Sequence, residues 1–489
     1  MESDIARNPR EVDEARRRIH NQYGGELASK ASAEFCLAFG RQTPEPEGFD
    51  AFYEGVVAET APARPMVIEC RPHRERVDLV RSATEEVKKA PAWGRLQESL
   101  EAMRTPELRL QTGRLLRQAA IESVRDDFYK TAGPISAEIE RSTPNLLGLG
   151  SEAIASPTAP SSITEICWLN SSILTQGDPR ALAEVAAAQE VERVDLPRLV
   201  ESEIGTTAGT VGAPQFRGAR GLTGQGIVIA IIDSEVSLRH PALQGRVIHK
   251  QNYTHEPWGN AGSHGTAVAG IAAADGDGLA GMAPEATIYN YKVMATNRHL
   301  NASDFRGALA IQHALEDGAH VANCSWGTGR VRASTSREAR AVNTAWSLGL
   351  TVVKSAGNAG PGTGTITTPA DADGIIVVGA TNQLGTAVQD YSSRGPTPSN
   401  ENRPHLVAPG GTESRGIDSC LVGGGFGDCG PGTSYAAPHV SGLLALILEG
   451  EPHLTPAQQR QRLLSVCTLI QGHDDNTQGA GLLSLAGLL

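Results

Sequence analysis

The second half of the chain shows a regular alternation that strongly constrains its fold. From residue 218 onward, short apolar runs alternate with Ala-rich stretches of helical length. Continuous apolar runs are typical of strands buried on both faces of a sheet. We therefore predict an α/β domain over 218–489, with a mainly parallel sheet and helices on both faces. The predicted strands are GIVIAII (226–232), ATIYNYKV (286–293), AHVANCS (319–325), LTVVKS (350–355) and GIIVVG (374–379).

The intervening segments carry helix signals. HGTAVAGIAAA, FRGALAIQHALEDG and SREARAVNTAWSLG are the predicted helices between strands. Gly318 and Gly349 stand where a C-terminal cap glycine belongs. Thr455 followed by Pro456 predicts a further helix start, with a capping hydroxyl and a proline in the first turn.

Size and charge narrow the class of protein. A chain of 489 residues predicts two or three domains. The net charge of −12 disfavours nucleic acid and anionic membranes as partners. No stretch of about 18 apolar residues predicts a membrane span, and the segment MESDIARNPREVDEARRRIH does not resemble a secretory signal. We therefore expect a cytoplasmic protein, with leaderless export left open.

The cysteines and acidic loops give no clear metal or disulfide framework. Seven scattered cysteines are neither a paired set nor a zinc motif. Cys420 and Cys429 flank a Gly-rich loop and can bridge if oxidised, although free thiols are expected in a reducing compartment. The DGDG segment (275–278) offers two carboxylates to calcium, but no complete ligand set is visible and a solvated turn is the simpler interpretation. No cofactor or metal is predicted.

Four polar residues stand at the ends of predicted strands or the starts of predicted helices. Asp233 ends the first strand, and His264 lies at a helix start in SHGTAVAG. Ser434 precedes an apolar helix in GTSYAAPHVSGLLAL, and Asn358 follows a strand in VVKSAGNAGPG. Hydrolysis by a serine nucleophile requires a hydroxyl, an imidazole base, a carboxylate that orients it and donors for the oxyanion. The four residues supply one candidate for each role.

Each of these residues also has an ordinary structural interpretation. The aspartate can close a strand, the histidine can lie at the surface, the serine can cap a helix and the asparagine can form a turn. Their combination and order favour the catalytic interpretation over four separate structural ones.

The same windows resemble the motifs of a known family, the subtilisin-like serine peptidases or subtilases. VIAIIDSEVSLRHPAL, SHGTAVAGIAAA and GTSYAAPHVSG are similar to its Asp, His and Ser motifs in that order, and SAGNAG to its Asn motif. The resemblance covers roughly 218–485. It implies that Ser434 is the nucleophile, His264 its base and Asp233 the orienting carboxylate, while Asn358 lines the oxyanion hole.

The resemblance also implies a substrate-binding set. Ser325, Trp326 and Gly327 would pair with an extended substrate by β-augmentation, and Ser355 and Gly357 would wall the pocket before the scissile bond. One departure is Ser234-Glu235, where the family usually has Thr-Gly. Glu235 is expected either to raise the basicity of His264, to mark a site for basic substrates, or simply to lie solvated in a loop.

The N-terminal part is similar to an inhibitor-type propeptide. Residues 1–60 predict a helical extension, and 61–200 a small α+β, ferredoxin-like domain. Its predicted strands are MVIEC (66–70), ITEICWLN and VERV, with a helix from Asp178-Pro179 and a helical insertion between about 72 and 160. An unrelated α/β domain is the alternative. Residues 201–217 predict a polar linker suited to cleavage.

Together these features predict a serine endopeptidase that forms an acyl-enzyme and is made as a self-inhibited zymogen. Its partners would be protein or peptide substrates and its own N-terminal pro-region. The alternative is a catalytically silent subtilase-fold binding protein. A third interpretation keeps the chemistry but restricts it to maturation of one dedicated partner protein.

Overall fold

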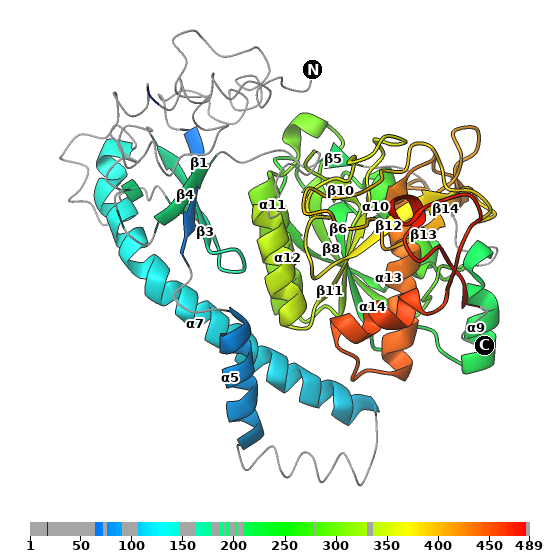
Figure 1. The fold of residues 1–489 in the computed structure, drawn as a ribbon, viewed down its shortest axis with the longest axis horizontal. Helices are drawn as coiled ribbons and strands as arrows, with labels where there is room; N and C mark the ends of the chain where they lie inside the picture. Colours follow the sequence, from blue (N-terminus) through cyan, green and yellow to red (C-terminus); the bar gives the residue numbers. More distant parts are fainter. Residues whose placement is uncertain are drawn as a thin grey trace. The chain divides into compact units, whose positions relative to one another are not determined.

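The computed structural model describes most of the second half of the chain and parts of the first. The chain forms two compact units, unit 1 with residues 1–79 and 122–198, and unit 2 with residues 80–121 and 199–489 (Figure 1). Apart from Arg17, the predicted extension 1–60 lies outside the described residues. The described residues are Arg17, 64–71, 76–89, 106–146, 163–177, 185–186, 188, 191–195, 201–202, 209–276, 279–329 and 336–485.

Unit 2 is built on a nine-stranded sheet with the order β16-β17-β13-β12-β11-β9-β6-β8-β7. Its neighbouring strands are parallel, except that β16 runs antiparallel to β17. The prediction of a mainly parallel sheet is therefore confirmed. The strands are β6 (Val228–Ser234), β7 (Val247–Asn252), β8 (Thr287–Met294), β9 (Val321–Cys324), β11 (Thr351–Ser355), β12 (Ile376–Thr381), β13 (Leu406–Pro409), β16 (Cys467–Thr468) and β17 (Leu482–Leu483).

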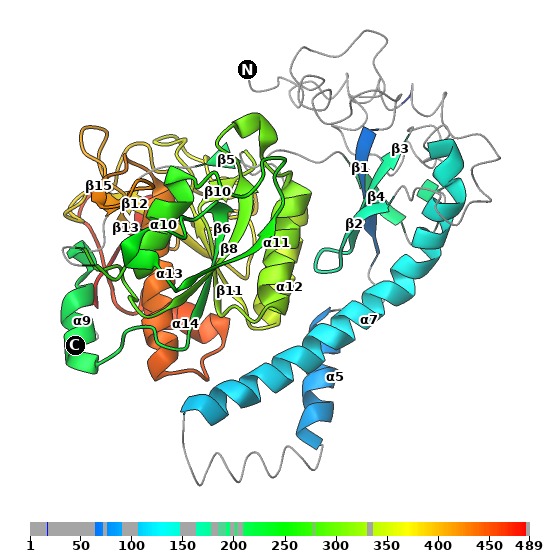
Figure 2. The same cartoon turned by 180° about the vertical axis from the view of Figure 1, so that it is seen from behind.

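Helices cover both faces of this sheet (Figures 1 and 2). Helices α10 (Ser263–Ala273) and α13 (Thr433–Gly450) pack together on one face, and α11 (Asp304–Glu316) and α12 (Arg337–Ser347) on the other. The remaining described elements of unit 2 are β5 (Glu201–Ser202), η3 (Gly209–Val211), α9 (Ala213–Arg220), η4 (Pro241–Leu243), η5 (Arg298–Leu300), β10 (Trp326–Gly327), β14 (Asp418–Cys420), β15 (Phe426–Asp428), α14 (Pro456–Leu464) and α15 (Asp475–Gln478).

Strand β6 occupies the point at which the sheet changes direction. Strands β8 and β7 extend the sheet from one side of β6, whereas β9, β11, β12 and β13 extend it from the other. In open α/β sheets, sites form beyond the carboxyl ends of the strands at such a switch point. The topology therefore directs attention to Asp233, near the carboxyl end of β6.

The local signals in the sequence account for three helix boundaries, the ends of α11 and α12 and the start of α14. Gly318 and Gly349 have φ values of 85° and 92°, as expected for glycines that end a helix. The Thr455 hydroxyl caps α14 and forms a reciprocal capping box with Gln458.

Four strands of the nine-stranded sheet were not predicted because their signals are weak. Strand β7 is an edge strand with mixed burial, β13 has four residues, and β16 and β17 have two each. Such short or half-exposed strands lack the long apolar run on which the prediction depended.

Unit 1 contains a four-stranded antiparallel sheet with the order β2-β3-β1-β4. The predicted strands near 66–70 and 191–195 are present, but ITEICWLN does not form a single strand. It enters a hairpin whose turn, Trp168–Ser171, includes Ser171 at φ 56°. Its strands are β1 (Arg64–Cys70), β2 (Ile163–Cys167), β3 (Ser172–Gly177) and β4 (Val191–Asp195), while helices α5 (Arg76–Lys89) and α7 (Pro106–Leu146) each have residues in both units.

The hairpin was missed because its turn has no glycine or proline. Trp168, Leu169 and Ile173 are all buried, so the apolar character continues through the turn. The predicted helix start at Asp178-Pro179 lies outside the described residues, although residues 185 and 186 are helical.

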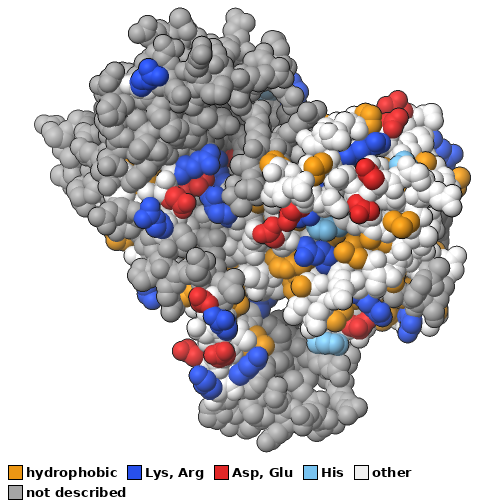
Figure 3. Space-filling model, viewed as in Figure 1, with side chains coloured by type: hydrophobic (Ala, Val, Ile, Leu, Met, Phe, Trp, Pro, Cys, Tyr) orange, Lys and Arg blue, Asp and Glu red, His pale blue; other side chains and the backbone are white. Residues whose placement is uncertain are grey.

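The surface of unit 2 carries both signs of charge. On the face shown in Figure 3, the described acidic and basic side chains are interspersed rather than gathered into one large patch. Among the described helices, none combines the length and apolar character needed to cross a membrane.

Helices α10 and α13 approach closely because small residues line their contact. A Cβ atom added at Gly442 of α13 would overlap Met282 and lie 2.7 Å from the carbonyl oxygen of Ala272 in α10. Ala436, Ala437 and Ala445 of α13 are also fully buried. This contact fixes how the first turns of the two helices lie over the sheet.

We expect Gly442→Ala to destabilise unit 2, because backbone on a neighbouring helix must move to accept the methyl group. The expected loss in free energy of unfolding is about 1–3 kcal/mol, measured by guanidinium denaturation. Gly218→Ala in α9 is the matched control, since nothing lies within 4 Å of its added Cβ. Equal stability of the two variants would show that the contact between the helices is not tight.

Candidate active site

Asp233 and His264 form a buried hydrogen-bonded pair. Asp233 is fully buried in β6, and its Oδ1 lies 2.7 Å from Nδ1 of His264. The same oxygen accepts the backbone N–H of Ser234 at 2.7 Å. Because the carboxylate fixes the proton on Nδ1, Nε2 keeps the lone pair that can accept a proton. The pair therefore presents an oriented base.

Ser234 joins the strand that carries Asp233 to the helix that carries His264. Its Oγ accepts the backbone N–H of Gly265 at 2.8 Å and so satisfies one of the exposed donors in the first turn of α10. A Cβ added at either Gly262 or Gly265 would overlap Ser234. The glycines therefore allow the helix start to lie directly against the strand end.

Ser434 lies in the first turn of α13, and the residue that follows it lies beside the histidine. Its Oγ donates to the carbonyl oxygen of Ser325 at 3.0 Å, and the Ser325 hydroxyl donates to the carbonyl oxygen of Ser434 at 2.5 Å. The ring of Tyr435, the next residue, has its centroid 5.1 Å from that of His264. Asp233, His264 and the start of α13 thus meet at one place.

A buried polar network holds Ser325 in position. Asn323 Nδ2 donates to Ser325 Oγ at 2.8 Å, and Ser441 Oγ donates to Asn323 Oδ1 at 2.9 Å. Asn323 is in β9 and Ser441 in α13, so the network joins the sheet to the helix beneath Ser434. Satisfied buried networks of this kind resist rearrangement.

Asn358 is exposed and its amide orientation is determined by Thr433. Asn358 Oδ1 accepts both the backbone N–H and the hydroxyl of Thr433, each at 2.9 Å. Thr433 Oγ1 in turn accepts the N–H of Gly357 at 3.1 Å. Because the carbonyl oxygen is engaged, Nδ2 is the part of the amide that can donate to a ligand.

The predicted substrate strand pairs with a segment of the predicted linker. Strand β10 (Trp326–Gly327) pairs antiparallel with β5 (Glu201–Ser202), with Trp326 opposite Ser202 and Gly327 opposite Glu201. Both strands belong to unit 2. The Trp326 side chain is fully buried, and a Cβ at Gly307 of α11 would contact its ring. The backbone of β10 can therefore accept an extended chain.

The other two predicted pocket residues lie next to Asn358. Ser355 ends β11 and is fully buried. Gly357 has φ 112°, and a Cβ there would contact Thr367 and Ser393. The structure thus places Ser355, Gly357 and Asn358 on one short segment beside the first turn of α13.

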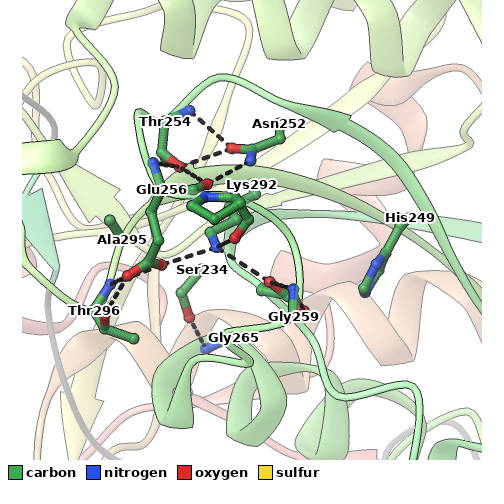
Figure 4. Close-up of polar contacts among 12 residues, drawn as sticks. Ser234, His249, Asn252, Thr254, Glu256, Gly259, Gly265, Lys292, Ala295 and Thr296 are labelled. Atoms are coloured by element: carbon green, nitrogen blue, oxygen red, sulfur yellow. Dashed lines mark hydrogen bonds and ion pairs between the residues drawn. The ribbon is translucent and has the colours of Figure 1, made fainter. Parts of the chain in front are cut away.

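Glu235 is neither solvated nor an uncompensated charge beside His264. It is 4% exposed, and its Oε2 lies 3.1 Å from Nζ of fully buried Lys292, which also lies 2.9 Å from Glu256 Oε2. Lys292 is opposite Asp233 in the pairing of β6 with β8. The expectations that Glu235 raises the basicity of His264, attracts basic substrates or lies in solvent are replaced by a buried ion cluster (Figure 4).

The Lys292 cluster, defined as Glu235, Lys292 and Glu256, holds the segment that precedes α10. Glu235 accepts the N–H of Gly259 at 2.9 Å, and Lys292 donates to the carbonyl oxygen of Pro257 at 3.0 Å. Figure 4 shows Lys292 with Glu256 on one side and Gly259 on the other. Burial raises the pKa of Glu256, but hydrogen bonds from Lys292 and Thr296 outweigh it and leave that pKa below its usual value.

Some predicted features lie outside the site. Cys420 and Cys429 are free thiols. Cys420 is opposite Phe426 in the pairing of β14 with β15, and the N–H of Cys429 donates to the carbonyl oxygen of Ile417, so the two cysteines are not opposite each other. Burial lowers the pKa of His439 to about 3, so it is neutral. Residues 277 and 278 of DGDG lie outside the described residues, within which no group of three or more potential metal ligands occurs.

Ser234, Thr433, Lys292 and Glu256 were missed by sequence reasoning. In the sequence, Ser234 is visible only as a departure from the family motif, and Thr433 only as the residue before Ser434. Lys292 had a usable signal, because a lysine inside the apolar run ATIYNYKV must be buried and paired.

We expect Lys292→Met to destabilise the protein by about 3–5 kcal/mol at neutral pH, because two buried carboxylates lose their cation. In the wild type, the pKa of Glu256 is lower in the folded protein than in the unfolded chain. Its ionised carboxylate therefore stabilises the fold at pH values above the usual glutamate pKa, and this stabilisation is lost as the pH falls below that value. The difference between variant and wild type should therefore shrink below about pH 4, near the usual glutamate pKa. Denaturant unfolding at the two pH values measures both effects.

Two controls separate the cluster from any loss of a lysine. Lys250→Met removes a half-exposed ion pair with Asp317 and should cost less than about 1 kcal/mol. Adding Glu235→Gln and Glu256→Gln to Lys292→Met should restore part of the loss. If Lys292→Met matches the wild type at neutral pH, the cluster does not stabilise the fold.

Comparison with known proteins identifies the family. Residues 224–481 match the model of the subtilase family. Serine protease AprX of Bacillus subtilis (strain 168) is 31% identical over 339 residues, 63% of this chain and 76% of AprX. Subtilisin E of the same organism is 34% identical over 52% of this chain and 63% of its own length. The structure of fervidolysin from Fervidobacterium pennivorans, a keratinolytic enzyme related to subtilisin, shares the fold, with a TM-score of 0.57 at 23% identity over 71% of this chain and 58% of that one. The chain therefore belongs to the subtilase family of serine endopeptidases.

Proposed function

We propose that this chain hydrolyses peptide bonds through an Asp233–His264–Ser434 triad and an acyl-enzyme. The observation that carries the proposal is the convergence at the carboxyl end of β6. Four segments far apart in sequence bring together a carboxylate–imidazole pair with a 2.7 Å contact, a serine at a helix start and an asparagine whose Nδ2 can donate. The substrates are proteins or peptides, bound as a strand on β10, and the chemistry uses no metal or cofactor.

In this proposal each group carries out one step. Ser434 Oγ leaves its hydrogen bond to Ser325, transfers its proton to Nε2 of His264 and attacks the carbonyl carbon of the scissile bond. Asp233 stabilises the imidazolium that forms. Asn358 Nδ2 and the backbone N–H at the start of α13 donate to the oxyanion. His264 then returns the proton to the leaving amine, and water hydrolyses the acyl-enzyme by the same steps.

We expect Ser434→Ala to abolish peptide hydrolysis and Asn358→Ala to lower kcat by about 10²- to 10³-fold with a small change in KM, a range established on subtilisin itself. The reason for the split is that the amide contacts the oxyanion rather than the bound substrate. Steady-state kinetics on one fluorogenic peptide measures both. A loss confined to KM for Asn358→Ala would contradict the oxyanion role.

A fluorophosphonate probe distinguishes catalysis from the silent binding alternative. Such a probe reacts only with an activated serine, so the wild type should be labelled and Ser434→Ala should not. An unlabelled wild-type protein, after its N-terminal part has been removed, would favour the binding role.

We also propose that the protein is made as a zymogen. The pairing of β5 with β10 supports this, because a segment of the same chain lies on the strand that a substrate would use. The main-chain hydrogen bonds of a β-ladder give affinity without depending on sequence. The N-terminal region would thus act as an intramolecular inhibitor until the chain is cut in the linker predicted between 201 and 217.

We expect the wild-type chain to shorten itself after expression, whereas Ser434→Ala keeps its full mass. Intact-mass spectrometry during prolonged incubation measures this. Mixing a trace of processed enzyme with Ser434→Ala tests whether cleavage also occurs between molecules. A wild-type chain that keeps its full mass while reacting with the fluorophosphonate probe would rule out autoprocessing and leave the catalytic proposal intact.

A further inference from the structure

A lysine lies buried at the wall of the proposed substrate pocket. Lys354, in β11, is fully buried. Its Nζ lies 3.0 Å from Ser355 Oγ and 3.3 Å from Thr367 Oγ1, and it also donates to the carbonyl oxygen of Ser355. These contacts place a buried positive charge directly beside Ser355, a residue predicted to contact substrate.

Two segments contact this ammonium group, and a third is hydrogen-bonded to one of them. Ser355–Gly357 forms one wall, and Gly357 packs against Thr367, which lies on the second segment. The third segment continues β10, because Thr328 donates its N–H to Thr368 at 3.3 Å and Thr368 donates its own to Gly329 at 3.0 Å. The Thr367–Thr368 segment thus links Lys354 on one side to the continuation of β10 on the other.

The register of β5 on β10 identifies which substrate residue reaches this place. Ser202 is opposite Trp326, so a bound strand that continued this antiparallel register by one residue would set that next residue opposite Ser325. The Ser325 carbonyl oxygen is the acceptor of the Ser434 hydroxyl. The residue opposite Ser325 is therefore the one whose carbonyl is attacked, and we call it the P1 residue.

We infer that Lys354 is a specificity-determining residue that selects an acidic P1 side chain. The inference rests on the proposed function and extends it to a substrate class. A P1 carboxylate close to the ammonium group gains a charge-assisted interaction in a site shielded from water. A P1 lysine or arginine meets like charge there, which works against binding.

The sequence of the linker agrees with this inference. Glu203 follows Ser202, and its own position lies outside the described residues. A strand in the register of β5 therefore carries a glutamate as its P1 residue. The proposal accordingly selects the Glu203–Ile204 bond as the processing site within the linker.

Peptides that differ only at P1 test the preference. Processed enzyme would be assayed on quenched fluorogenic peptides with Glu, Gln, Leu or Lys at P1. We expect kcat/KM for the Glu peptide to exceed that for the isosteric Gln peptide at least about tenfold, equivalent to one close charge interaction of about 1.4 kcal/mol. Equal or better cleavage of the Gln, Leu or Lys peptide overturns the proposal.

Lys354→Met tests whether this lysine causes the preference. It should lower the Glu-over-Gln ratio of kcat/KM to about one, whereas Lys250→Met, which changes a partly buried lysine in β7, should keep the ratio. The labelling rate with a fluorophosphonate verifies an intact site in each variant. A Glu preference that survives Lys354→Met overturns the assignment.

Processing of the full chain provides a second test that does not depend on the folding of Lys354→Met. Glu203→Lys should slow self-cleavage at least about tenfold, whereas the matched Glu201→Lys should not. N-terminal sequencing of the wild-type product should give Ile204. A mature N-terminus preceded by a non-acidic residue overturns the proposal. Absence of both labelling and hydrolysis of every peptide is a different result, because it refutes the proposed function itself.

Discussion

The structure of unit 2 depends on the close contact of two helices over one face of a parallel sheet. Gly442 and its small neighbours let α13 lie directly against α10. The first turn of α10 holds His264 and that of α13 holds Ser434, so the packing of the helices also sets the distance between the residues that we propose as base and nucleophile. Polar links across the same region, from Ser234 to Gly265 and from Asn323 to Ser441, keep the helices from sliding. The contacts that hold the two helices together therefore also hold His264 and Ser434 in place.

Two lysines of the parallel sheet are fully buried, and they have different neighbours. Lys292 lies between Glu235 and Glu256, and this cluster anchors the segment that leads into α10. Lys354 donates to hydroxyl and carbonyl oxygens of Ser355 and Thr367, beside the segment that leads to Asn358. Burial of an ion is expensive unless nearby groups compensate it. Glu235 and Glu256 compensate the charge of Lys292 within the fold. Lys354 lies where we propose that the substrate side chain binds.

Local patterns in the sequence predicted the sheet, and they also marked the residues that we propose for the site. Apolar runs marked β6, β8, β9, β11 and β12, and glycine or threonine caps marked helix ends. The partners Thr433 and Lys292 were not predicted, because their roles depend on contacts with residues many positions away. The same reason explains the error over Glu235, because the lysine that neutralises its charge, Lys292, lies 57 residues later in the chain. The hairpin of β2 and β3 was missed because burial continues through its turn.

The pairing of β5 with β10 has a consequence for how such a protein responds to dilution. An occupant tied to its site by a linker is present at an effective concentration on the order of millimolar, whatever the concentration of the protein. Diluting the intact chain therefore does not empty the strand site, and a competing peptide must reach a similar concentration to enter it. Once the tether is cut, the same contact becomes an ordinary association between two molecules. A single broken peptide bond thus changes occupancy of the site from a fixed property of the chain into one set by concentration.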